Sequence, residues 1–133
     1  MDLNEYYEEQ RKRVRKIYNG KKHFSYNNRD AFANWYVEQL KKYECRCYYC
    51  ETSIHDIKRL IDAKVLKTRA VRGNGSRGSV LEIDKDNIYS KDTCVLACYY
   101  CNNDKSYTLE KEDYKIYFGE NRKKYFKKLL ESL

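Results

Sequence analysis

The sequence predicts an α+β fold, in which a small core at residues 45–107 is held together by cysteines and flanked by helical regions at 1–44 and 108–133. Three observations predict this class. Two Cys-x-x-Cys pairs lie far apart in the chain, two short β-type segments precede the second pair, and apolar residues recur at helical spacing near both ends. A chain of 133 residues has the length of one domain, so we expect all three regions to form one.

The first region predicts two helices. Apolar side chains recur at helical spacing from Leu3 to Tyr18, and Gly20 offers a stop. A second helix is expected to begin near Asn28 or Asp30. Its large apolar residues share one face: Phe32, Trp35, Tyr36 and Leu40. A shared face is more typical of core packing than of a platform for stacking bases.

The core region predicts short elements around its cysteines. Thr52 or Ser53 is expected to cap a short apolar helix. Val80–Asp84 and Cys94–Ala97 read as two short strands, because both are rich in β-branched and apolar residues. A helix is expected around Asn102–Ser106, directly after the second cysteine pair.

The third region predicts helix again. Thr108 is expected to cap it, and Gly119 is expected to break it. The helix after that break carries its apolar residues on one side: Tyr125, Phe126, Leu129, Leu130 and Leu133.

The strongest motif is the set of four cysteines in the two pairs: Cys47, Cys50, Cys98 and Cys101. Two thiolate pairs are what a tetrahedral zinc ion needs to join two distant segments. Four thiolates leave no open position for water, so the predicted zinc is structural. The two other cysteines, Cys45 and Cys94, fit small buried residues better than ligands.

The compartment follows from the same cysteines. The N-terminus is acidic and lacks the apolar run of a secretory signal, and no stretch is long enough to span a bilayer. A secreted scaffold with three disulfides is the alternative, and the missing signal disfavours it. We therefore expect an intracellular, cytoplasmic protein with no membrane partner.

The charge balance indicates a polyanionic partner. Lys and Arg number 28 against 20 Asp and Glu, which gives a net charge of +8. This excess favours nucleic acid first and an anionic membrane surface second, although a basic surface also serves solubility alone. Residues 63–81 contain no acid. The expected nucleic-acid contacts lie there and beside the second pair: Lys67, Arg69, Arg72, Arg77 and Lys105.

A glycine-rich stretch at 73–78 matches G-x-G-x-x-G, but it does not predict a dinucleotide site. That fingerprint needs a strand before it and a helix after it, whereas a basic segment precedes this one and a strand follows. The glycines are better explained as a mobile loop or as a backbone that approaches phosphate.

The run 81–85, followed by 94–105, resembles the ββα-metal core of HNH-type endonucleases. The resemblance is to those members in which two Cys-x-x-Cys pairs bind a structural zinc ion in a treble-clef-like arrangement. The resemblance covers Cys47 to Ser106 and leaves out the flanking helices. It implies that Asp84 and Asn102 bind a catalytic divalent cation, Mg²⁺ or Mn²⁺, in addition to the structural zinc.

Two positions depart from the family pattern. Lys85 stands where the family has the histidine that acts as general base, and Thr93 stands where it has the asparagine that positions this base. The two histidines of the chain, His23 and His55, lie outside the motif. A lysine holds its proton at neutral pH, so Lys85 is suited to gripping a phosphate rather than to activating water.

The sequence therefore predicts an HNH-like zinc protein that binds nucleic acid, DNA before RNA, or a nucleic-acid-processing protein complex, with conventional nuclease catalysis impaired. An active divalent-metal-dependent DNA endonuclease with an atypical base stays open, with Asp84, Lys85 and Asn102 as its catalytic residues. A structural zinc module within a larger assembly is a further alternative. By analogy with where such folds occur, an accessory protein of a phage or mobile element fits the predicted class.

Overall fold

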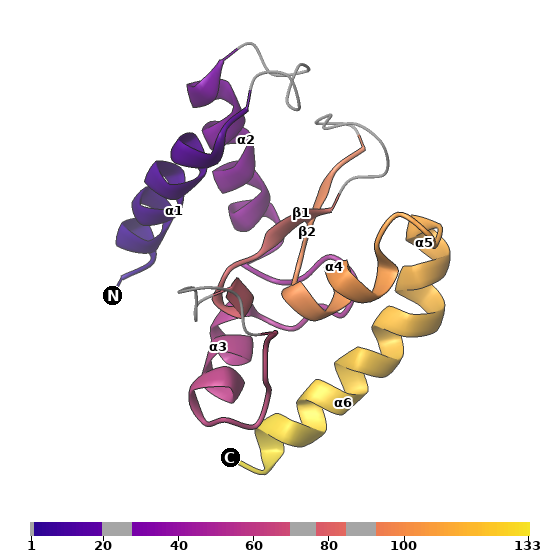
Figure 1. Ribbon diagram of the computed structural model, residues 1–133. Coiled ribbons are helices and arrows are strands. Elements are labelled where there is room, and N and C mark those ends of the chain that lie inside the picture. The colour runs from indigo at the N-terminus through magenta and orange to yellow at the C-terminus, as the bar shows by residue number, and fades with distance from the viewer. Residues whose placement is uncertain (1, 20–27, 70–76, 85–92) are drawn as a thin grey trace.

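The computed structural model describes residues 2–19, 28–69, 77–84 and 93–133. The fold is a mostly helical α+β arrangement with one β-hairpin, and Figure 1 shows its elements. In chain order they are α1 (Leu3–Ile17), α2 (Arg29–Lys42), α3 (Ile54–Asp62), the 3₁₀ turn η1 (Arg77–Ser79), β1 (Glu82–Asp84), β2 (Val95–Ala97), α4 (Tyr99–Lys105), α5 (Lys111–Tyr114), the π-helical turn η2 (Lys115–Gly119) and α6 (Glu120–Glu131).

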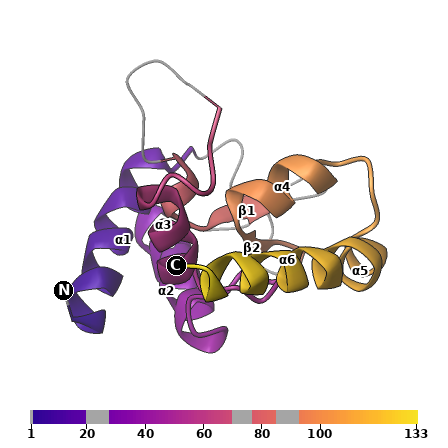
Figure 2. The same cartoon turned by 90° about the horizontal axis from the view of Figure 1, so that it is seen from below.

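Helices α1 and α2 lie side by side in both views (Figures 1 and 2). The α2 helix begins where the sequence predicts, because the Asn28 side chain accepts a hydrogen bond from the Ala31 backbone N–H at 2.8 Å. All of its predicted core residues are buried: Phe32, Trp35, Tyr36 and Leu40. The helix predicted over Leu3 to Tyr18 is confirmed as α1, in which Val14 is buried while the terminal Leu3 and Ile17 are more than half exposed.

The hairpin pairs β1 with β2 in antiparallel register, with Glu82 opposite Ala97 and Asp84 opposite Val95. Each strand is only three residues long, shorter than the predicted segments. A buried hydrogen bond from the Tyr36 hydroxyl to the Leu81 carbonyl oxygen, 2.6 Å long, ties α2 to the start of the hairpin. The N-terminal helices therefore brace the hairpin from one side.

Helix α4 begins inside the second cysteine pair, three residues before the expected Asn102. Cys98 is its N-cap, and the Cys98 sulfur accepts the backbone N–H of Cys101 at 3.4 Å. A cysteine sulfur thus takes the capping role that Ser, Thr, Asn or Asp usually fills. Helix α3 follows the prediction, since Ser53 caps it through the backbone N–H of His55 at 3.2 Å.

The C-terminal segments α5, η2 and α6 follow one another without a break and form one long helix (Figure 1). The break expected at Gly119 is wrong. A side chain at this position would place its Cβ within 2.8 Å of the Tyr49 carbonyl carbon, so the glycine serves close packing of the helix on the first cysteine loop. Glu110, rather than Thr108, caps this helix by accepting the Asp113 N–H at 2.8 Å.

Some sequence predictions fall outside the described residues, namely those on Arg72, Lys85 and the glycines at 73 and 75. Among the described residues, no helix combines the length and the apolar character that crossing a bilayer requires.

Candidate metal centre

The first cysteine pair lies in a tight loop between α2 and α3. The Cys47 sulfur faces two backbone N–H groups, those of Tyr49 at 3.4 Å and Cys50 at 3.5 Å. The Cys47 backbone N–H donates to the Thr52 carbonyl oxygen at 3.1 Å, and Glu51, with φ of 58°, closes the loop in the left-handed region. These contacts fix the position of the Cys47 sulfur in the loop.

The second pair is placed by the hairpin and by α4. Cys98 directly follows β2, and Cys101 lies in the first turn of α4. The Tyr48 backbone N–H donates to the Leu96 carbonyl oxygen at 2.9 Å, which holds the first cysteine loop beside β2. This bond brings together two cysteine pairs that the sequence separates widely.

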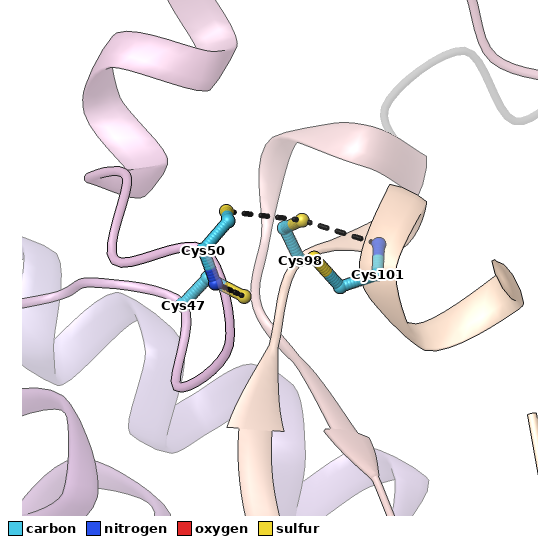
Figure 3. Close-up of side chains that lie close together, drawn as sticks. All are labelled: Cys47, Cys50, Cys98 and Cys101. Atoms are coloured by element: carbon cyan, nitrogen blue, oxygen red, sulfur yellow. Dashed lines mark hydrogen bonds between the residues drawn. The ribbon is translucent and has the colours of Figure 1, made fainter. Parts of the chain in front are cut away.

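The four cysteine side chains converge from these two segments (Figure 3). Their sulfurs all lie within 4.8 Å of one another, and those of Cys50 and Cys98 are 4.0 Å apart. A zinc ion with bonds of about 2.3 Å to four sulfurs sets them about 3.8 Å apart at the corners of a tetrahedron. A disulfide needs a bond of about 2.05 Å, and all six cysteines are free thiols. The spacing therefore fits a metal.

The electrostatics of the four thiols also call for a cation. Burial raises the pKa of the Cys98 thiol, while hydrogen bonds from Cys101 and its neighbours hold the pKa of Cys50 well below its usual range. Burial therefore opposes the simultaneous ionisation of these neighbouring thiols. A divalent cation at their centre allows all four to ionise, because it compensates the charge that burial disfavours. The residues present fit a structural Zn²⁺ site with Cys47, Cys50, Cys98 and Cys101 as ligands.

Cys45 and Cys94 lie outside this group of ligands. Both are buried, with exposed fractions of 2% and 5%. The thiol of Cys45 packs against Tyr7, and burial raises the pKa of Cys45. Their place in the core agrees with the prediction that they are small buried residues.

Each cysteine pair encloses two tyrosines, and all four hydroxyls tie the metal centre to other segments. The Tyr48 hydroxyl donates to Glu112 Oε1 at 2.8 Å, and that of Tyr49 donates to Asp84 Oδ2. The Tyr99 hydroxyl accepts the Arg69 backbone N–H at 2.9 Å, and the Tyr100 hydroxyl donates to the Lys67 carbonyl oxygen at 3.0 Å. The metal centre therefore fixes the C-terminal helix, the hairpin and the basic segment that follows α3.

The residues predicted to bind a divalent cation lie on two neighbouring elements: Asp84 ends β1, and Asn102 lies in α4. Asp84 is 2% exposed, and its Oδ2 lies 3.4 Å from Nζ of Lys105, whose side chain is fully buried. Lys105 Nζ also donates to the Ser106 carbonyl oxygen at 3.1 Å. The prediction that Lys105 contacts nucleic acid is corrected here, because its ammonium points inward to neutralise a buried carboxylate.

Asn102 makes a second polar contact along the same strand and helix. Its Nδ2 donates to Glu82 Oε2 at 2.8 Å. Glu82 and Asp84 share one face of β1, and Asn102 and Lys105 share one face of α4, so two polar contacts join the strand to the helix. Both residues predicted to bind a divalent cation are thus engaged in contacts between β1 and α4: Asp84 contacts Lys105, and Asn102 contacts Glu82.

The basic residues predicted at the surface are only partly described. Lys67 and Arg69 are exposed and line one cleft together with residues of α4 and α6. Arg77 lies in η1, where its backbone alone is described, and Arg72 lies outside the described residues. His55 is exposed and packs edge-on against the Tyr6 ring at 4.8 Å between centroids. It lines a separate cavity between α1 and α3.

Sequence reasoning missed the tyrosines, the inward role of Lys105 and the position of Arg122 beside the basic segment. A repeated signal marks the tyrosines, since both cysteine pairs read Cys-Tyr-Tyr-Cys. No local pattern marks Lys105 or Arg122, because their partners come from distant segments.

The fold and the site together define a small α+β protein with a four-cysteine metal centre that fits zinc. Comparison with protein-family models, with curated proteins and with solved structures finds no match to this chain. The hairpin and the cysteine centre therefore stand without a family assignment.

Proposed function

We propose that this chain is a zinc-stabilised nucleic-acid-binding protein, DNA being the first candidate, whose HNH-like core lacks conventional nuclease catalysis. The observation that supports the lack of nuclease catalysis is the contact between Lys105 and Asp84. The carboxylate that would bind the catalytic cation lies buried against an ammonium and accepts the Tyr49 hydroxyl. An internal cation competes directly with an external one for the same oxygen atoms.

The distribution of charge supports the proposal that the chain binds nucleic acid. The net charge is +8, and the stretch from 63 to 81 carries basic residues and no acid. Lys67 and Arg69 in this stretch are exposed, and their backbone groups bond to the hydroxyls of Tyr99 and Tyr100 in α4. Exposed cations on a fixed backbone are suited to contacting the phosphates of a nucleic acid.

The test combines cleavage and binding. Zinc-loaded protein is incubated with supercoiled DNA in the presence of Mg²⁺ or Mn²⁺, and the same protein is assayed for retention of labelled DNA and RNA over a range of salt concentrations. We expect no nicking, together with retention that weakens as salt increases.

The control for cleavage is the double variant Asp84→Asn with Lys105→Met, which removes both charges and leaves neither partner buried alone. Metal-dependent nicking by the wild type that disappears in this variant would show an active endonuclease and overturn the proposal. Absence of any salt-sensitive retention of DNA or RNA would leave the zinc centre in place and remove the nucleic-acid function.

A further inference from the structure

Three cations from two distant segments meet in one cleft beside the second cysteine pair. Lys67 and Arg69 come from the segment after α3, and Arg122 comes from α6. The cleft has a volume of about 400 Å³, and Asp104 is the one acidic residue among the described residues that line it. The lining therefore carries two more positive than negative charges, which an anion would relieve.

Lys67 and Arg69 are held at this cleft by the zinc-binding helix. The two tyrosines between Cys98 and Cys101 bond to the backbone of both residues, at 3.0 Å for Lys67 and 2.9 Å for Arg69. The side chains of Lys67 and Arg69 are left exposed while their backbone is fixed. The metal centre thus fixes the backbone that carries the two cations before any ligand arrives, which lowers the entropy cost of binding.

Arg122 is held from the opposite side. Its guanidinium carbon lies 5.7 Å from the centre of the Phe126 ring, and Nη2 is 3.5 Å from Asp104 Oδ2. Asp104 also accepts the Tyr114 hydroxyl at 3.0 Å. The guanidinium also interacts electrostatically with the sulfurs of Cys101 and Cys98. The Arg122 side chain is 24% exposed. The guanidinium is thus fixed in place with part of its surface open to the cleft, and planar guanidinium groups pair well with phosphate.

A second basic cleft lies where α1 ends and α2 begins. Four cations line it: Lys12, Arg15, Lys16 and Arg29. Arg15 is already paired with Asp30 at 2.9 Å, and the pair is exposed. No hydrogen bond from the metal centre reaches this cleft among the described residues. It resembles a solvated helix face and supplies a matched control.

We propose that the cleft formed by Lys67, Arg69 and Arg122 is a phosphate-binding site, and that the tyrosines between the zinc ligands position its cations. The ligand is a phosphate group of the nucleic-acid backbone, so the proposal rests on the function proposed above and places its interface.

The experiment measures the affinity of zinc-loaded protein for a short labelled DNA duplex by fluorescence anisotropy at several salt concentrations. Each phosphate contact contributes about 0.9 to the slope of log affinity against log salt. Arg122→Gln should lower the slope by about 0.9 and the affinity about tenfold near 0.1 M salt. The double variant Lys67→Gln with Arg69→Gln should lower the slope by about 1.8, and its exposed side chains can be removed without disturbing the fold.

Two further variants separate charge from structure. Arg122→Lys should recover the slope, because it keeps the positive charge, whereas a purely structural role would not be rescued in this way. Tyr99→Phe with Tyr100→Phe should weaken binding without changing the slope, because the charges remain and only their positioning is lost. An unchanged affinity in the tyrosine variant would overturn the positioning role.

The matched control is Lys12→Gln with Lys16→Gln, which removes two charges from the other basic cleft. It should lower the slope by much less than the Lys67 and Arg69 variant. An equal or larger decrease would overturn the proposed site and leave DNA binding itself standing.

Pyrophosphate serves as a probe that tests phosphate binding in the cleft independently of nucleic-acid binding. Added to isotope-labelled protein, it should shift the NMR signals of the 67–69 backbone and of the Arg122 guanidinium. Such shifts without DNA binding would retain the cleft as a phosphate site and remove the nucleic-acid function. DNA binding without any shift or variant effect at this cleft would overturn the cleft alone.

Discussion

Two buried polar clusters lie near opposite ends of α4, and they obtain their positive charge in different ways. At the start of the helix, four cysteine sulfurs lie within 4.8 Å of one another, and the Arg122 guanidinium interacts electrostatically with two of them, Cys98 and Cys101. A single guanidinium cannot balance four thiolates. Near its end, the Asp84 carboxylate lies 3.4 Å from the Lys105 ammonium. The first cluster requires an ion from outside, whereas the second carries its counter-charge in the chain. A buried group of negative charges therefore calls for a metal ion where the cations of the protein are too few to balance it.

The two clusters also differ in what they contribute to stability. Structural zinc adds its binding free energy to folding, because the site does not exist in the unfolded chain. A buried ion pair gains little over apolar residues of similar size, since desolvation offsets its attraction, yet it becomes costly when one partner is lost. Two predictions test this contrast and a third tests the packing beside the first cluster, in decreasing order of expected effect.

Loss of the metal should have the largest effect. Chelation, or Cys47→Ser or Cys101→Ser, should abolish the cooperative thermal unfolding transition, because it removes a contribution on the order of 10 kcal/mol. Circular dichroism during heating measures this transition. The control is Cys94→Ala, at a buried cysteine outside the cluster, which should cost about 1 kcal/mol. An unfolding midpoint unmoved by chelator would rule out the zinc centre.

Loss of one partner of the ion pair should come next. Lys105→Met removes the buried ammonium that lies 3.4 Å from the Asp84 carboxylate and should reduce the free energy of unfolding by about 3–5 kcal/mol. Adding Asp84→Asn should recover most of that loss, because the amide carries no charge and still accepts the Tyr49 hydroxyl. Denaturant titration of the single and double variants measures both steps. A double variant as unstable as Lys105→Met would show that packing, and not charge, dominates this cluster.

A change at Gly119 should have the smallest effect of the three. Alanine adds about 1 kcal/mol of helix propensity, but its Cβ would meet the Tyr49 backbone of the first cysteine loop. Overpacking against backbone that cannot retreat costs about 1–3 kcal/mol, so we expect a net loss of about 1–2 kcal/mol in denaturant titration. Asn121→Ala, two residues further along at an exposed position, should stay within about 0.5 kcal/mol. A stabilised Gly119→Ala protein would contradict the close packing of α6 on this loop.

Local signals in the sequence predicted the elements whose causes are local. Asn28 and Ser53 cap helices as expected, because an N-cap depends on residues within one turn. The predictions at Gly119 and Thr108 were wrong because the local sequence there fits more than one structure. A glycine in a helix can mark an end or a close contact, and only the position of Tyr49 distinguishes the two.

The sequence by itself determined the four cysteines of the candidate zinc site and the helices α2 and α3, because the spacing of cysteines and of apolar residues encodes them within short segments. Only the tertiary structure decided that Lys105 turns inward to Asp84, that the tyrosines tie the metal centre to three other segments, and that Arg122 joins Lys67 and Arg69 in one cleft. The physical reason is the range of the contacts. A charged side chain has the same local pattern whether it faces solvent or a buried partner, and burial is set by segments that are distant in the chain.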